Sequence, residues 1–226
     1  MRKIICLAIA LFLSVGSFSA YAEDGCTEVK NSSGQVTKRT CANDITTYAY
    51  STKNGENTVT MTKYAKTAKG KQGNTIDYLK TVYNADETVK STESRSYNEA
   101  GTRVGGVITE YENGKVVSLK NEEYQGSKNL IGYSQTTYGY DEQGRILSEN
   151  TITKGRNDSG ALVQTGSNEK TYEYNPSGSY QVYENGKLLG RYNKNGSEIV
   201  SKKIYTIQEA EALSKENGNK VRLRYR

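Results

Sequence analysis

Tyrosine and apolar residues alternate with polar residues in short segments that glycine-bearing turns separate. In the stretch YGYDEQGRILSENTI, residues 138–152, Tyr138 and Tyr140 fall on one face of a strand and Gly139 on the other, because strand side chains alternate. The tetrad Asp141 to Gly144 has Asp first and Gly fourth, which favours a type I turn followed by a left-handed residue. An apolar and β-branched run follows, so the stretch predicts a β-hairpin.

The same pattern of strand and turn residues recurs along the chain. Similar tetrads occupy 98–101, 175–178 and 193–196, and Asn-Gly pairs at 54–55, 113–114 and 185–186 are strong signals for short hairpin turns. Several tyrosines lie 14 residues apart, which is one strand plus one turn: Tyr50, Tyr64 and Tyr78, then Tyr83, Tyr97 and Tyr111, and again Tyr124 and Tyr138. We therefore expect an all-β fold over residues 45–200, in which repeated antiparallel hairpins form a long twisted meander sheet of about 10 to 14 strands.

The N-terminus has the three parts of a secretory signal peptide. Arg2 and Lys3 precede an apolar run from Ile4 to Val15, and an Ala-x-Ala site ends at Ala22. Residues 1–22 are therefore predicted to be a signal peptide. No later segment approaches the roughly 20 apolar residues of a membrane helix, so we expect an exported protein, periplasmic or extracellular, that does not span the membrane.

Two cysteines, Cys26 and Cys41, remain after the leader is removed. A metal site or a redox pair needs closer spacing or further ligands, so a structural disulfide is the favoured interpretation in an oxidising compartment. Closing a loop of about 15 residues could contribute on the order of 3 kcal/mol. We expect this bond to tether an N-terminal segment, residues 23–44.

The pattern of apolar and polar residues changes at Ser201, near the carboxyl end. Thr206 and Glu209 form a capping box, and the apolar residues after it repeat at helical spacing, which predicts a helix at about 207–216. Apolar residues alternate with arginines at the end of the chain and predict a strand at about 220–226. Residues 201–226 are thus expected to form a strand-helix-strand cap that protects the end of the sheet.

Tyrosine is the main aromatic residue. The chain has 19 tyrosines and no tryptophan, and both of its phenylalanines lie in the leader. One hypothesis is that the rings pack on one another as a thin core, with their hydroxyls near water. The other is that they form a ligand surface, for which Tyr138, Tyr140, Tyr172 and Tyr174 are the candidates because each pair shares a face.

Composition limits the available chemistry. The chain has no histidine, which excludes Ser-His and Cys-His nucleophile systems and leaves out the commonest general base. Glu122 and Glu123, like Asp141 and Glu142, are neighbours that would point to opposite faces of a strand. Gly105 and Gly106 indicate a bulge or strand irregularity. We expect no enzyme activity, no cofactor, no metal site and no nucleic-acid partner.

The stretch YGYDEQGRILSE, residues 138–149, resembles the YD repeat of RHS-type proteins, with partial matches at 97–117 and 172–199 where Asn or Glu replaces Asp. In that family the units are strand pairs, associated with the cell surface and with carbohydrate binding. The resemblance implies a short exported member of the YD-repeat family.

These observations together predict a non-enzymatic exported protein of the cell envelope, acting as a structural or ligand-binding module. Its partner would be a glycan or a cell-surface protein. The alternative is an accessory subunit of a surface or toxin system that carries YD repeats.

Overall fold

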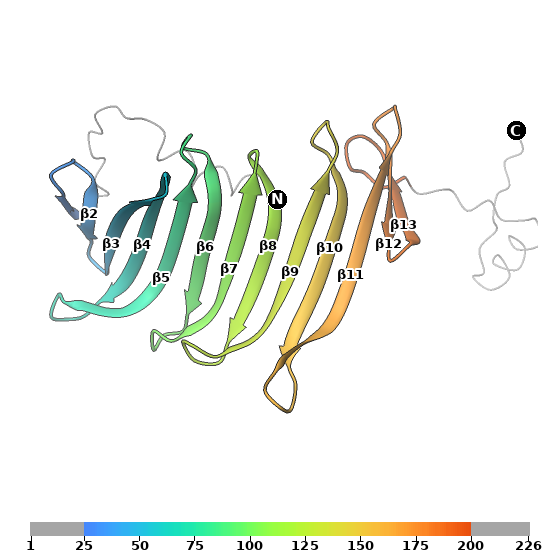
Figure 1. Ribbon diagram of the computed structural model, residues 1–226. Coiled ribbons are helices and arrows are strands. Elements are labelled where there is room, and N and C mark those ends of the chain that lie inside the picture. The colour runs from blue at the N-terminus through green and yellow to red at the C-terminus, as the bar shows by residue number, and fades with distance from the viewer. Residues whose placement is uncertain (1–24, 200–226) are drawn as a thin grey trace, which may run out of the picture. The chain divides into compact units, whose positions relative to one another are not determined.

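A computed structural model describes residues 25–199, and the strands in it form one antiparallel sheet in which each strand lies beside its sequence neighbours (Figure 1). The sheet has 13 strands in the order β1 to β13. Their bounds are β1 Thr27–Lys30, β2 Val36–Thr40, β3 Asp44–Lys53, β4 Glu56–Lys66, β5 Gln72–Tyr83, β6 Val89–Tyr97, β7 Arg103–Glu112, β8 Lys115–Tyr124, β9 Leu130–Tyr140, β10 Ile146–Arg156, β11 Leu162–Tyr174, β12 Tyr180–Glu184 and β13 Lys187–Tyr192.

Asn-Gly pairs make the tightest hairpins. At each of the three pairs both residues have positive φ, for example 54° at Asn54 and 80° at Gly55. The flanking residues are directly paired, as Lys53 is with Glu56. Two residues in this conformation match the right-handed twist of the strands that they join, which is why the pair is so strong a hairpin signal.

Longer turns use the tetrad that ends in glycine. In the tetrad that joins β9 to β10, the Gly144 N–H donates to the Asp141 carbonyl at 2.9 Å, and the Asp141 Oδ1 accepts the N–H of Arg145 at 2.8 Å. The first residue is therefore an acceptor for the returning backbone, a role that an Asn amide oxygen fills equally well. Asn residues accept the corresponding N–H at Asn31, Asn98, Asn157 and Asn193.

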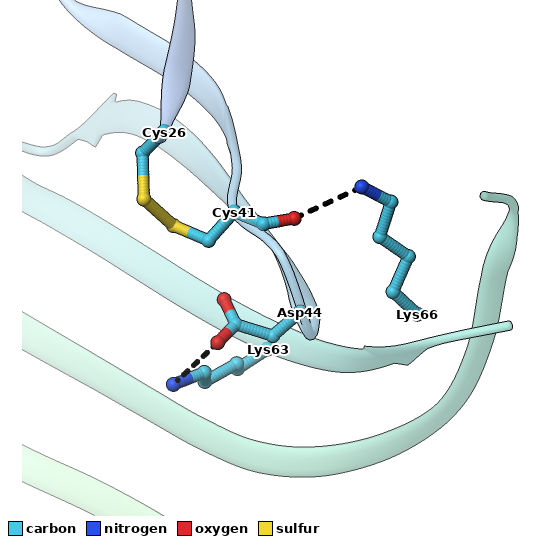
Figure 2. Close-up of a disulfide and its surroundings, with 5 residues drawn as sticks. All are labelled: Cys26, Cys41, Asp44, Lys63 and Lys66. Carbon is cyan, nitrogen blue, oxygen red and sulfur yellow. Dashed lines mark hydrogen bonds and ion pairs between the residues drawn. A yellow bond between two sulfur atoms is a disulfide. The ribbon is translucent and has the colours of Figure 1, made fainter. Parts of the chain in front are cut away.

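The disulfide lies at the N-terminal end of the described sheet (Figure 2). Cys26 precedes β1 and Cys41 follows β2, so their bond closes the open end of the β1–β2 hairpin. The Cys41 carbonyl accepts a hydrogen bond from the Lys66 ammonium at 3.0 Å, and Lys63 pairs with Asp44 at 3.1 Å. The predicted Cys26–Cys41 pairing is thus present, and the N-terminal segment is itself a pair of strands.

Very little of the described chain is buried. Ile45, 3% exposed, and Val182, 5% exposed, are its buried apolar residues, while Thr46, Ser118 and Glu122 are its buried polar ones. The described chain divides into two compact units, and β9, β10 and β11 each contribute residues to both. Among residues 25–199, the first unit contains 25–138 together with Asn150–Ser167, and the second contains Gly139–Glu149 together with 168–199.

The all-β antiparallel meander is confirmed in the part of the chain that the structure describes. Residues 25–199 contain no helix, and so none long and apolar enough to cross a membrane. The predicted signal peptide and the predicted C-terminal cap, with its helix at 207–216 and strand at 220–226, lie outside the described residues.

The irregularity expected at Gly105 and Gly106 lies one residue earlier. Both glycines pair regularly with β6 and β8, and the pairing of β6 with β7 skips Val104. Gly106 instead marks a close approach of the Arg103 side chain, described below, and the bulge belongs to Val104.

Glu87 stands where the other tetrads carry glycine. Its φ is 66°, and its N–H donates to the Asn84 carbonyl at 3.0 Å. A left-handed conformation costs an L-residue about 1–2 kcal/mol, partly offset by the larger entropy that glycine loses on folding. We expect Glu87→Gly to raise the free energy of unfolding in urea by about 0.5–1 kcal/mol.

Gly70→Ala is the matched control for that change. Gly70 has a φ of 71°, and a Cβ there would meet only the Lys66 Cε at 3.8 Å, so the substitution isolates backbone strain. It should lower stability by about 1 kcal/mol. A destabilising Glu87→Gly would contradict this account of the turn.

Candidate functional site

Four tyrosines stand side by side on one face of the second unit. Tyr174 on β11 pairs with Tyr180 on β12, which pairs with Tyr192 on β13, so the three share one face of the sheet. The ring centroids of Tyr174 and Tyr180 are 5.3 Å apart, and those of Tyr180 and Tyr192 are 5.2 Å apart and stacked. Tyr172 joins them, 6.3 Å from Tyr180. We call these four residues the tyrosine ridge.

Packing within the ridge shields a small apolar centre. Val182 lies between Tyr172 on one neighbouring strand and Gly190 on the other, and it is only 5% exposed. The Tyr192 ring folds back over Gly190, where a Cβ would lie 2.9 Å from the Tyr192 hydroxyl. Glycine at this position therefore lets the ring lie against its own strand.

Charged groups flank the β11 side of the ridge. The Tyr172 hydroxyl donates to the Glu149 carboxylate at 2.5 Å. Burial, this hydrogen bond and the charge of Glu149 all raise the pKa of Tyr172 well above its usual value. The Arg145 guanidinium lies 4.2 Å from the centre of the Tyr174 ring and donates to Asp141 at 2.6 Å.

These contacts affect what the ridge can offer a ligand. Tyr180 is flanked on both sides by neighbouring rings, and Arg145 covers Tyr174. A ligand would therefore meet ring edges and phenol hydroxyls more than open ring faces. Within the described chain, the hydroxyls of Tyr174, Tyr180 and Tyr192 make no hydrogen bond.

The structure brings part of the sequence-predicted surface together. Tyr172 and Tyr174 are both in the ridge, and Tyr140 is a half-buried residue of the same unit, whereas Tyr138 belongs to the first unit. Tyr180 and Tyr192 were missed, because only the strand register shows that they align with Tyr174. Whether these tyrosines bind a ligand stays a prediction.

A second cluster surrounds a buried carboxylate on the first unit. Glu122 on β8, 8% exposed, accepts hydrogen bonds from Arg103 at 3.0 Å, from Lys120 at 2.7 Å and from the Tyr124 hydroxyl at 3.0 Å. The Arg103 guanidinium also lies over the Tyr124 ring, 3.9 Å from its centre. Two cations and a phenol thus enclose one carboxylate on the sheet surface. We call Glu122, Arg103, Lys120 and Tyr124 the Glu122 cluster.

Gly106 makes room for the Glu122 cluster. Gly106 pairs directly with Glu122, and a Cβ on it would lie 2.8 Å from the Arg103 guanidinium and 2.9 Å from the Ser94 carbonyl oxygen. A larger residue would therefore push Arg103 away from Glu122. This close approach is the physical reason for a glycine within the strand.

Cation–ring contacts continue on both sides of the Glu122 cluster, one of them made by Lys120 itself. Arg95 lies 4.0 Å from the centre of the Tyr78 ring and pairs with Glu93 at 2.7 Å. Lys120 lies 4.4 Å from the centre of the Tyr133 ring. Each such contact contributes about 0.5–1 kcal/mol at an exposed site.

Electrostatics hold Glu122 in its charged form. Burial would raise the pKa of Glu122, but the hydrogen bonds from Lys120 and Tyr124 and the charges of Lys120 and Arg103 outweigh it, so the pKa lies below its usual range. Its neighbour Glu123 pairs with Gly132, and it is exposed on the opposite face. The two carboxyls therefore do not face each other across a shared site.

Comparison with known proteins leaves the family open. A scan against protein-family models found no matching family, and a search of curated proteins found no matching sequence. Among residues 25–199, no group of three or more Asp, Glu, Cys or His side chains is placed to hold a metal ion. The resemblance to YD repeats remains a prediction from the sequence.

Removing the buried carboxylate should cost more than breaking an exposed pair. Glu122→Ala leaves Arg103, whose side chain is 12% exposed, without its carboxylate, and should lower the free energy of unfolding by about 2 kcal/mol. Glu56→Ala is the control, because its pair with Lys90 is exposed and should be worth at most about 0.5 kcal/mol. Equal losses in urea denaturation would show that the Glu122 cluster adds nothing.

Alkaline pH should destabilise the second unit through Tyr172. Its pKa is raised in the folded protein, so its contribution is complete below the unfolded pKa of about 10 and is lost as pH rises above that value. Tyr172→Phe should cost about 1 kcal/mol at pH 8, and it should flatten the fall in stability measured above pH 10.

Tyr111→Phe serves as the control for the alkaline experiment, because the Tyr111 hydroxyl makes no hydrogen bond within the described chain. An alkaline profile of Tyr172→Phe as steep as that of the parent would contradict the role given to Glu149.

Proposed function

We propose that this chain is a non-enzymatic exported protein of the cell envelope that binds a glycan through the tyrosine ridge. The observation that supports this most directly is that the hydroxyls of Tyr174, Tyr180 and Tyr192, on three adjacent strands, make no hydrogen bond within the described chain. A glycan is rich in hydroxyls and extended, so it can pair with several of them at once.

Ring packing within the tyrosine ridge holds the tyrosine hydroxyls in fixed positions. Tyrosine loses few side-chain torsions on binding, and the stacked neighbours at 5.2 and 5.3 Å already fix the ring orientations before a ligand arrives. Pre-ordered donors lower the entropic cost of binding. Glu149 and Asp141 add acceptors beside the ridge, although each is already engaged by Tyr172 or Arg145.

Two independent features support export, one in the sequence and one in the structure. The sequence pattern of residues 1–22 is that of a signal peptide, and the Cys26–Cys41 disulfide is of a type that persists in oxidising compartments. The proposed location is the periplasm or the extracellular space.

The turn geometry supports the resemblance to YD repeats. Asp141, the aspartate of the best-matching unit, accepts the N–H of the residue after the turn, and asparagines do the same in other units. The replacement of Asp by Asn therefore leaves the hairpin intact. On this basis the alternative function is an accessory subunit of a surface or toxin system, with a protein as partner.

The test removes hydroxyls and keeps the rings. Tyr174→Phe combined with Tyr192→Phe preserves stacking, and it should weaken binding to a glycan selected on an array by roughly thirtyfold, at about 1 kcal/mol for each of the two hydrogen bonds. Tyr111→Phe, on the first unit, is the matched control and should bind as the parent does.

Unchanged glycan affinity in the double variant would refute the ridge as the binding site. Absence of binding to any glycan, with stoichiometric co-purification of one protein, would favour the accessory-subunit alternative.

A further inference from the structure

A shallow hollow of about 280 Å³ lies on the first unit, over β8 to β11. Asn121 and Ser134 are directly paired across β8 and β9, as are Glu123 and Gly132, so these four residues share one face. A Cβ on Gly132 would lie 3.8 Å from the Gly155 Cα, which places the two glycines side by side on adjacent strands. Thr153 and Thr165 complete the polar border.

Gly155 has no structural need to be glycine. Its φ lies outside the left-handed region, and a Cβ there would meet only the Thr165 Cγ2, at 3.4 Å, which is ordinary contact. Gly132 differs, because a Cβ on it would lie 3.0 Å from the Lys154 carbonyl oxygen. A glycine within a strand costs roughly 0.5–1 kcal/mol, so Gly155 is a residue that packing does not explain.

The polar groups at the border are available to a ligand. The side chains of Asn121, Glu123 and Ser134 make no hydrogen bond or ion pair within the described chain. Together they offer an amide, a carboxylate and a hydroxyl, which can both donate to and accept from vicinal hydroxyls. The Lys154 ammonium lies 5.8 Å from the centre of the Tyr133 ring, and Tyr133 pairs with Glu122 on the opposite face. Among the border side chains the Glu123 carboxylate is therefore the charged group on the face of the hollow, and it disfavours an anionic ligand.

We propose that this hollow binds a single ring of a neutral sugar, as a second subsite for the glycan ligand proposed above. Its volume of about 280 Å³ is slightly below the usual range for small-molecule sites, which suits one ring. Tyr138 stands on the same face of β9, four residues beyond Ser134, about 13 Å along the strand. An oligosaccharide seated in the hollow can therefore extend along β9 to this tyrosine.

Gly155→Val is the decisive variant. Valine occupies part of the hollow and has a high strand propensity, so the sheet should be at least as stable as in the parent. Gly166→Val is the matched control, because Gly166 is a strand glycine of the same unit that does not border the hollow, and its nearest contact would be the Thr153 Cβ at 3.8 Å.

The measurement is residue-resolved NMR on the purified, oxidised protein, titrated with glucose, galactose and N-acetylglucosamine. We expect chemical-shift changes at Asn121, Ser134 and Gly155, a dissociation constant raised about tenfold or more in Gly155→Val, and no change in Gly166→Val. Shifts at the hollow that persist undiminished in a folded Gly155→Val would overturn the proposal, as would no shift there with any of the three sugars.

The same spectra separate this proposal from the proposed function. Shifts confined to Tyr174, Tyr180 and Tyr192 support the ridge and overturn the hollow. Shifts confined to the hollow support it and overturn the ridge, and a protein that responds at neither place overturns both.

Discussion

A single layer of strands has no interior, and this constraint governs the described part of the protein. Apolar side chains cannot leave water by pointing inward, and Ile45 and Val182 are the apolar residues that become buried there. Side chains must instead cover one another on the sheet surface. Tyrosine suits this task because its ring supplies area while its hydroxyl stays hydrated. Burial accordingly raises the pKa of tyrosines on both units, including Tyr48, Tyr78 and Tyr174.

The two side-chain clusters solve the same problem in different ways. On the second unit, tyrosines stack on one another and shield Val182. On the first, Arg103 and Lys120 lie over tyrosine rings and share the carboxylate of Glu122. A carboxylate at 8% exposure is costly unless several donors satisfy it, and here three do. The Glu122 cluster therefore takes the place of a core on the sheet surface. In the tyrosine ridge, by contrast, three phenol hydroxyls make no hydrogen bond within the described chain.

Side chains on such a sheet stay accessible to solvent, whereas in a domain with two packed layers many of them would be buried between the layers. Binding on it needs no cleft between layers, because a row of rings or a missing side chain is enough to shape a subsite. The tyrosine ridge and the hollow beside Gly155 are the two subsites that we propose on the described chain. Both suit a ligand that is extended and rich in hydroxyls, and each can be removed by substitutions that leave the strands intact.

Local chemistry made much of the fold predictable from sequence. Asn-Gly pairs and tetrads ending in glycine specify hairpins through backbone conformations that other residues adopt only at a cost. Cys26 and Cys41, the even pair that remains after the predicted signal peptide, indicated their disulfide. Strand register is a property of pairs of strands, and it alone decided that Tyr192 aligns with Tyr174 and that Gly106 lies beside Glu122. The sequence by itself determined where the chain turns, and tertiary structure decided which side chains meet, because cross-strand neighbours are set by pairing and by bulges such as the one at Val104.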